Sequence, residues 1–199
     1  MNLNRNRCRG LTRILAASLW LCVAVMESMA QPSVGGIVYG PKGAFNISAP
    51  KGWVLDPSAG AAQGQPCVLY PKDMTWDTAD PIMYAKIAGT KFEDYEAFAK
   101  FAVDHMKAER PGSKWKRIKT GKSDGGLPWF INEYPATKSY GRHELVAYIQ
   151  LPKAVAFVVF SADEEAAFNK HKGDLEEAVK TIRSMEVDYP GKGKKPEDR

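Results

Sequence analysis

The feature that most constrains the fold is a pair of apolar segments in the second half of the chain. Glu144 to Leu151 alternates between apolar and polar side chains, which is the pattern of a strand with one covered face. Pro152 and Lys153 form a turn, and the segment 154–161 that follows is apolar on both faces. A strand of that kind must be covered on both sides. The pair therefore predicts a hairpin whose second strand is central in a sheet.

Shorter apolar runs bounded by Pro and Gly predict further strands, and residues 56–66, which are rich in Gly, Ala, Gln and Pro, predict a loop. The predicted strands are 36–39, 44–48, 53–55, 67–70, 81–88 and 115–120.

Residues 90–110 carry the clearest helical pattern. Thr90 and Glu93 have the spacing of a capping box, and Pro111 with Gly112 should end the helix. Apolar side chains recur at helical spacing on one face, at Phe92, Tyr95, Ala99, Ala102, Val103 and Met106.

A second helix is predicted after the hairpin. Ser161 and Glu164 repeat the capping-box spacing, and an apolar stripe runs from Phe168 to Met185. Gly173 interrupts this stripe, so we expect the helix to kink or restart there. Two helices among runs of antiparallel strands predict an α+β fold with a single antiparallel β-sheet and helices packed on its faces, an α/β/α sandwich.

The first 30 residues have the three-part pattern of a secretory signal, with four Arg, an apolar run over 14–26, and small residues ending at Ala30. We expect cleavage after Ala30 and a periplasmic or secreted product. A membrane-spanning helix is a weaker interpretation because the apolar run is too short. A lipid anchor at Cys22 is also weaker, because Leu21 is bulky where that processing needs a small residue. The predicted organisation is a signal over 1–30, one domain over 31–190 and a basic tail over 191–199.

The formal net charge of +5 over 199 residues comes from the two ends of the chain. Residues 31–190 hold 20 basic and 20 acidic side chains. A neutral body in an exported protein argues against a nucleic-acid partner. The tail leaves weak contact with anionic lipid as a possible interaction. The basic run around Trp115, from Lys114 to Lys122, does not form one clean stripe, so we interpret it as a solvated edge strand, with an acidic partner or a phospholipid headgroup as the alternative.

Removal of the signal leaves Cys67 as the single cysteine, so the exported domain has no internal disulfide. Cys67 lies in an apolar strand-like run, which favours a buried thiol over a reactive or intermolecularly paired one.

The order of elements resembles the PsbP, Mog1 and DcrB-like group of domains. The resemblance is carried by the strand Phe45 to Ser48 that leads into Pro50-Lys51-Gly52-Trp53, and by a closing helix that ends in Ile182-Arg183-Ser184-Met185. It covers about residues 37–188. It implies an α/β/α sandwich that binds or assembles other components without catalysis, and it carries no catalytic residue set to this chain.

Two loops offer candidate ligand-binding residues. The segment 140–144 presents Tyr140, Arg142 and His143, which could bind an anion or a polar ligand, although a plain hairpin connection is the simpler interpretation. The loop 73–80 presents Trp76 and Asp77 together with Asp73 and Asp80. It suggests an ion- or sugar-contacting loop, with turn formation and capping as the simpler interpretation, because the calcium-loop spacing is missing.

No complete catalytic set is found. The sequence lacks a Gly-x-Ser-x-Gly elbow, and its three histidines do not have metal-ligand spacing, so we predict no catalytic residues, no metal and no cofactor. His105 and His171 are interpreted as solvated helix residues. The leading hypothesis is an exported, non-enzymatic binding or assembly domain of the cell envelope that contacts a partner protein or a small ligand. The alternative is a hydrolase, or another enzyme, that uses Asp73, Asp77, Asp80 or His143 around a cleft.

Overall fold

The computed structural model describes residues 35–186, which form ten strands, three α-helices and one short 3-10 helix. The helices are α1 (Tyr95–Glu109), α2 (Glu165–His171) and α3 (Asp174–Lys180), with the 3-10 helix η1 over Ala61–Gln63. The strands are β1 (Gly35–Gly40), β2 (Gly43–Ser48), β3 (Trp53–Asp56), β4 (Val68–Pro71), β5 (Ile82–Ile87), β6 (Lys116–Lys122), β7 (Pro128–Tyr134), β8 (His143–Gln150), β9 (Val155–Ala162) and β10 (Arg183–Met185).

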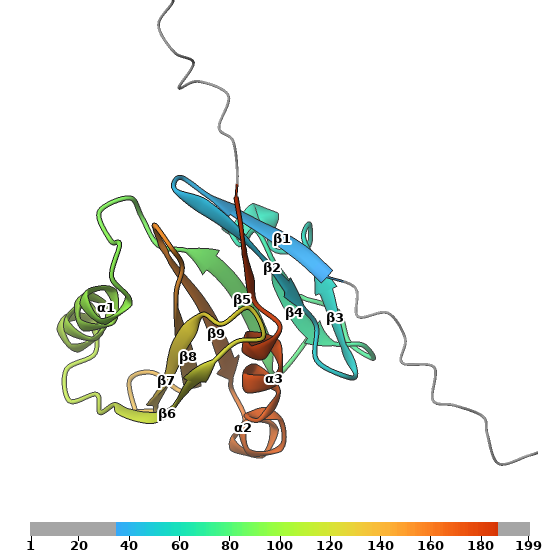
Figure 1. Ribbon diagram of the computed structural model, residues 1–199. Helices are drawn as coiled ribbons and strands as arrows, with labels where there is room; N and C mark the ends of the chain where they lie inside the picture. Colours follow the sequence, from blue (N-terminus) through green and yellow to red (C-terminus); the bar gives the residue numbers. More distant parts are fainter. Residues whose placement is uncertain (1–34, 187–199) are drawn as a thin grey trace, which may run out of the picture. The chain divides into compact units, whose positions relative to one another are not determined.

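A seven-stranded antiparallel sheet is the largest layer, with the order β3-β4-β5-β9-β8-β7-β6 (Figure 1). The predicted hairpin is confirmed as β8 and β9, and β9 lies between β5 and β8. Helix α1 packs on one face of this sheet, against β8 and β9. Helices α2 and α3 pack on the opposite face. The apolar character of β9 on both faces is therefore explained by a layer on each side.

The prediction of a single sheet is wrong, because β1, β2 and β10 form a separate three-stranded sheet. This small sheet shares the main core with the large sheet, and Phe45 of β2 is completely buried there. Glycines allow β1 to approach the large sheet closely. A Cβ atom at Gly36 would lie 2.5 Å from Leu55 Cδ2, and one at Gly40 would lie 2.6 Å from Ile87 Cβ. The α+β class and the antiparallel pairing are confirmed. The small sheet also contacts α3, through β2.

Helix α1 begins later than predicted. Its N-cap is Asp94, whose carboxylate accepts a hydrogen bond from the Ala97 amide at 2.7 Å, so the predicted Thr90–Glu93 capping box is wrong. Glu93 instead forms an ion pair with Lys42 at 2.6 Å, which links the turn between β1 and β2 to the start of α1. The predicted stop is confirmed, since the helix ends at Glu109.

The second helix restarts at Gly173, as predicted, and gives the two short helices α2 and α3. The predicted Ser161–Glu164 capping box is wrong because Ser161 lies inside β9. The amides of Asp163 and Glu164 donate instead to the Asp80 carboxylate, at 2.8 and 3.0 Å. For Asp80, the predicted capping role is thus confirmed.

We expect Asp80→Ala to lower the free energy of unfolding by about 1–2 kcal/mol, because two amides before α2 lose their acceptor. The matched control is Asp77→Ala in the same loop, an exposed position where a change within about 0.5 kcal/mol is expected. Urea denaturation of both variants measures the difference. Equal stabilities would contradict the capping role.

The predicted helical end at Ile182 to Met185 is also wrong, because Arg183–Met185 forms β10 and pairs with β2. Side chains turn the chain out of α3. The Thr181 hydroxyl donates to the Ala178 carbonyl at 2.7 Å and accepts from the Ser48 amide at 2.9 Å. The Arg183 amide donates to Asn46 Oδ1 at 3.1 Å. These bonds favour a strand beside β2 over another helical turn.

The basic strand β6 is the exposed edge of the large sheet, as predicted. Its cations have local partners. Lys116 pairs with Glu133 at 2.9 Å, Arg117 pairs with Glu96 at 2.5 Å, and Lys119 pairs with Glu176. The carboxylates of neighbouring elements therefore compensate much of the positive charge of this strand.

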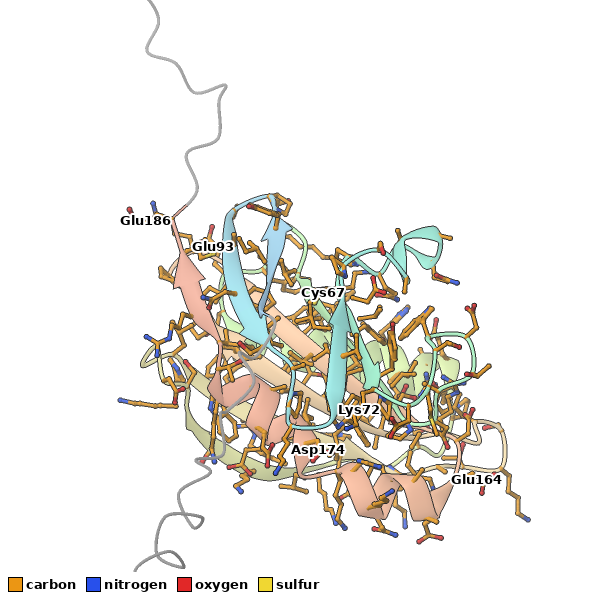
Figure 2. All side chains as sticks on the ribbon, turned by 90° about the vertical axis from the view of Figure 1, so that its right-hand side faces the viewer. Cys67, Lys72, Glu93, Glu164, Asp174 and Glu186 are labelled. Carbon is orange, nitrogen blue, oxygen red and sulfur yellow. The ribbon has the colours of Figure 1, made fainter. Side chains whose placement is uncertain are left out.

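Cys67 lies immediately before β4, inside the main core, and is 1% exposed (Figure 2). Burial raises the pKa of its thiol to about 12. The prediction of a buried, structural cysteine is confirmed, because a reactive thiol needs access and a lowered pKa.

No helix within residues 35–186 has the length and apolar character needed to cross a membrane. The predicted signal, its cleavage after Ala30 and the basic tail 191–199 lie outside the described residues.

Candidate ligand-binding site

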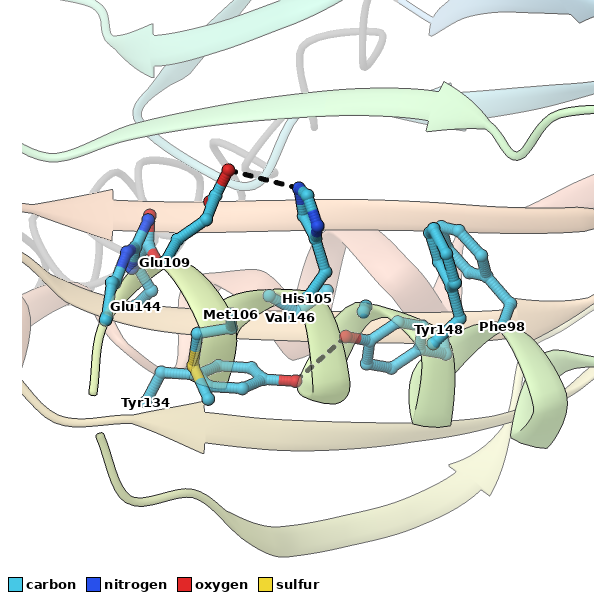
Figure 3. A pocket seen from close by; sticks show the side chains of 11 residues that line it. Phe98, His105, Met106, Glu109, Tyr134, Glu144, Val146 and Tyr148 are labelled. Carbon is cyan, nitrogen blue, oxygen red and sulfur yellow. Dashed lines mark hydrogen bonds and ion pairs between the residues drawn. The ribbon is translucent and has the colours of Figure 1, made fainter. Parts of the chain in front are cut away.

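A cavity of about 300 Å³ lies between α1 and the strands β7 and β8 (Figure 3). Its walls are mostly apolar. Helix α1 contributes Phe98, Phe101, Ala102 and Met106, and β8 contributes Val146. A concave, mainly apolar cavity with a few polar groups is the usual form of a small-molecule site.

Two tyrosines meet at the floor of the cavity. Tyr134 from β7 and Tyr148 from β8 point toward each other, and their hydroxyl oxygens are 2.9 Å apart (Figure 3). Asn132 Nδ2 donates to the Tyr134 hydroxyl at 3.4 Å. Tyr134 is 6% exposed and Tyr148 is 1% exposed. Burial raises the pKa of both phenols, so both stay protonated and able to donate.

One end of the cavity carries a charged pair. Arg110 Nη1 lies 3.1 Å from Glu144 Oε2, and the Arg110 guanidinium stacks 3.2 Å from the centre of the Tyr140 ring. The Tyr140 hydroxyl donates to Glu144 Oε1 at 2.7 Å. Burial, together with this carboxylate, raises the pKa of Tyr140 to about 12. These contacts hold Glu144 from two sides and fix this end of the cavity.

The outer side of the cavity is formed by the more exposed residues of α1. His105 Nε2 lies 3.1 Å from Glu109 Oε1, and its ring stacks on Phe101. Both His105 and Phe101 are exposed, so the prediction of a solvated His105 is confirmed. These residues therefore form the solvent-facing side of the cavity.

The three candidate residues of the loop 140–144 lie in three different environments. Tyr140 lies beside Glu144 and Arg110 at the charged end of the cavity. Arg142 pairs with Asp163 at 2.6 Å. His143 packs against Phe168 of α2, with ring centres 5.2 Å apart, and Phe168 belongs to the main core on the other face of the sheet. The three residues therefore do not converge on one ligand position.

The other two candidates, Trp76 and Asp77, lie in the connection between β4 and β5. Trp76 is half-buried and Asp77 is exposed. The Thr75 and Thr78 hydroxyls, 2.9 Å apart, form a turn around them. Neither residue lines the cavity under α1.

Asp73, Asp77 and Asp80 do not form an ion site. Within residues 35–186, no group of three or more His, Cys, Asp or Glu side chains is placed to hold a metal ion. Neither these carboxylates nor His143 line the cavity. The geometry that would favour the hydrolase alternative, these groups around one cleft, is therefore not found there.

The sequence interpretation missed most of the cavity. It assigned one apolar face of α1 to the core, yet Phe98 and Phe101 lie outside that predicted face and extend the apolar surface of the helix. The sequence did contain a signal for this cavity. The apolar surface of the predicted helix is wider than the stripe that packs on one face of a sheet. Tyr134 and Tyr148 are 14 residues apart, and their contact depends on the register of β7 against β8, where Tyr134 is opposite Glu144.

The fold and the cavity define a class: an α+β domain of two antiparallel sheets with helices on both faces of the larger sheet and an apolar cavity under one helix. No family model matches the sequence, and no curated protein matches it.

Solved structures with a similar fold include LpqN of Mycobacterium tuberculosis, described as involved in cell envelope biogenesis. It has a TM-score of 0.52 and 15% identity, and the match covers 78% of this chain and 93% of LpqN. A cyanobacterial PsbP from Synechocystis sp. PCC 6803 matches with a TM-score of 0.47 and 13% identity, over 82% of this chain and 99% of that protein. The Ran-binding protein Mog1p of Saccharomyces cerevisiae matches with a TM-score of 0.46 and 15% identity, over 76% and 94%. The predicted resemblance to the PsbP and Mog1 group is confirmed as a likeness of fold, and of these three matches LpqN carries the fold assignment.

Proposed function

We propose that this chain is an exported, non-enzymatic binding domain of the cell envelope that holds a small, mainly apolar ligand between α1 and the β7–β8 pair. The observation that carries the proposal is the cavity of about 300 Å³ with apolar walls and a tyrosine pair on its floor. Cavities of this size and lining are the usual small-molecule sites of proteins.

A small ligand is a better occupant than a partner protein for this site. Protein partners usually bury about 800 Å² on each side of a specific interface, whereas this cavity is a local hollow under one helix. Tyr140 and Arg142 are proposed to order the loop at the charged end. A ligand role for Trp76, Asp77 and His143 stays a prediction.

The cellular setting rests on the sequence. The pattern of the first 30 residues is that of a cleaved export signal, which supports a periplasmic or secreted chain. LpqN is described as involved in cell envelope biogenesis, and we propose the same compartment, without the same role, for this chain. Mass spectrometry of the exported protein should give Gln31 as its first residue.

The binding proposal is tested by titration with N-phenyl-1-naphthylamine, an uncharged dye that fluoresces in apolar surroundings. We expect saturable binding at one site per chain, with blue-shifted emission, because the cavity of about 300 Å³ has mainly apolar walls that suit the uncharged aromatic rings of the dye. Emission that rises linearly without saturation, or no change at all, would contradict the proposal.

A further inference from the structure

The apolar walls of the cavity indicate an apolar ligand, and the hydroxyl groups on its floor indicate which hydrogen-bonding group that ligand carries. Tyr134 and Tyr148 have one hydroxyl hydrogen each, and their mutual hydrogen bond at 2.9 Å uses only one of the two. Asn132 Nδ2 donates to the Tyr134 hydroxyl at 3.4 Å, so this nitrogen adds a hydrogen to the pair, and Oδ1 of the same amide is buried without a hydrogen-bond partner. Within residues 35–186, the second hydroxyl hydrogen has no hydrogen-bond acceptor.

The remaining donor belongs to one of two nearly buried side chains. Tyr134 is 6% exposed and Tyr148 is 1% exposed, and both line the cavity. A buried donor without an acceptor is destabilising, so an acceptor atom that enters the cavity removes that cost. The raised pKa of each phenol keeps the donor available at neutral pH.

The charged residues around the cavity are already paired with each other. Arg110 is held by Glu144 at 3.1 Å, and His105 lies 3.1 Å from Glu109. An anionic or cationic ligand would therefore lose its hydration shell without meeting an unpaired counter-charge. The lining consequently favours a ligand without net charge.

We infer that the ligand of this cavity is a neutral molecule with an apolar body and one hydrogen-bond acceptor oxygen, such as a carbonyl or an ether, which accepts from the Tyr134–Tyr148 pair. This inference rests on the proposed function, because it names the ligand class of the same cavity. It explains why two phenols occupy a floor that apolar side chains could otherwise fill.

The test compares three naphthalenes that differ in one group. The ketone 2-acetylnaphthalene has an acceptor oxygen, 2-ethylnaphthalene has a similar shape without one, and 2-naphthoate is an anion. Their affinities are measured by displacement of N-phenyl-1-naphthylamine from the full chain and from the variant Tyr134→Phe/Tyr148→Phe. The double variant keeps both rings and removes both donors, and circular dichroism and thermal unfolding verify that it is folded.

We expect the affinity ratio of ketone to hydrocarbon to fall at least about fivefold in the double variant, because the buried ketone oxygen then has no donor. Comparing ratios removes the difference in water solubility between the two probes. We also expect 2-naphthoate to bind more weakly than the ketone to the unmodified chain. An unchanged ratio, or tighter binding of 2-naphthoate, overturns the inference while the binding function stands. If none of the three probes binds, both the inference and the proposed function fail.

Discussion

Replacing Trp53 by alanine is expected to lower the free energy of unfolding by about 3–5 kcal/mol, the range for large aromatic residues removed from a core. Trp53 is 8% exposed and belongs to the main core. Its ring lies 6.4 Å from that of Phe160 and 5.7 Å from that of His171, measured between ring centres. Its indole Nε1 donates to Asp174 Oδ2 at 2.8 Å. Asp174, which is labelled in Figure 2, is the first residue of α3.

One further variant at Trp53 and one control at another tryptophan separate the contributions. Trp53→Phe keeps an aromatic ring and removes the hydrogen bond to Asp174, so we expect a loss of about 1 kcal/mol from that bond, in addition to the smaller ring. Trp115→Ala is the control at a tryptophan that is 39% exposed, where the loss should be well below that of Trp53→Ala. Chemical denaturation of the three variants gives the values. A loss for Trp53→Ala no greater than that for Trp115→Ala would contradict the anchoring role.

The second large effect is expected at Ala102, which faces the cavity from the middle of α1. Ala102→Trp should lower the affinity for N-phenyl-1-naphthylamine at least about tenfold, because the indole fills space that the dye requires. Ala102 is only half-buried and borders the empty space of the cavity, so the indole can occupy that space without unfolding the domain. Fluorescence titration measures the affinity.

The matched control for this variant is Ala108→Trp. Ala108 lies on the same helix, is exposed, and does not line the cavity. The same tryptophan at that position should leave the affinity unchanged within about twofold. If the two variants bind the dye equally well, the dye site is elsewhere and the assignment of the cavity is wrong.

The parts of the fold that the sequence predicted are those with local patterns. The β8–β9 hairpin followed from alternation and from a strand apolar on both faces, and the restart at Gly173 followed from the break in an apolar stripe. The buried state of Cys67 followed from its apolar neighbours. In each case, residues close in the sequence determine the structure.

The parts that were predicted wrongly depend on distant residues. Whether β2 joins the large sheet or forms a second one is decided by its pairing with β10, which is far away in the sequence. Ile182 and Met185 have helical spacing, but Thr181 and Asn46 direct the chain into a strand. The cap of α2 is supplied by Asp80 from another loop. Propensity and spacing cannot identify such partners.

The candidate site shows the same limit. Tyr140 was identified from its polar neighbours, and it does lie at the charged end of the cavity. The cavity itself needs α1 to lie over β7 and β8, and it needs a register that brings Tyr134 and Tyr148 together. Trp76 and Asp77 were predicted as ligand-binding residues because their loop contains a tryptophan and several carboxylates. Ordinary turns have the same composition, and neither residue lines the cavity.

The most direct test of the account is a heteronuclear NMR titration of the isotope-labelled protein with 2-acetylnaphthalene. The account predicts saturable shifts of the amide signals of α1 and β8, including Ala102 and Val146, with little change in α2 and α3 at Phe168 and Val179. Shifts concentrated on α2 and α3, or no shifts at high probe concentration, would contradict the claim that the cavity under α1 is a ligand-binding site.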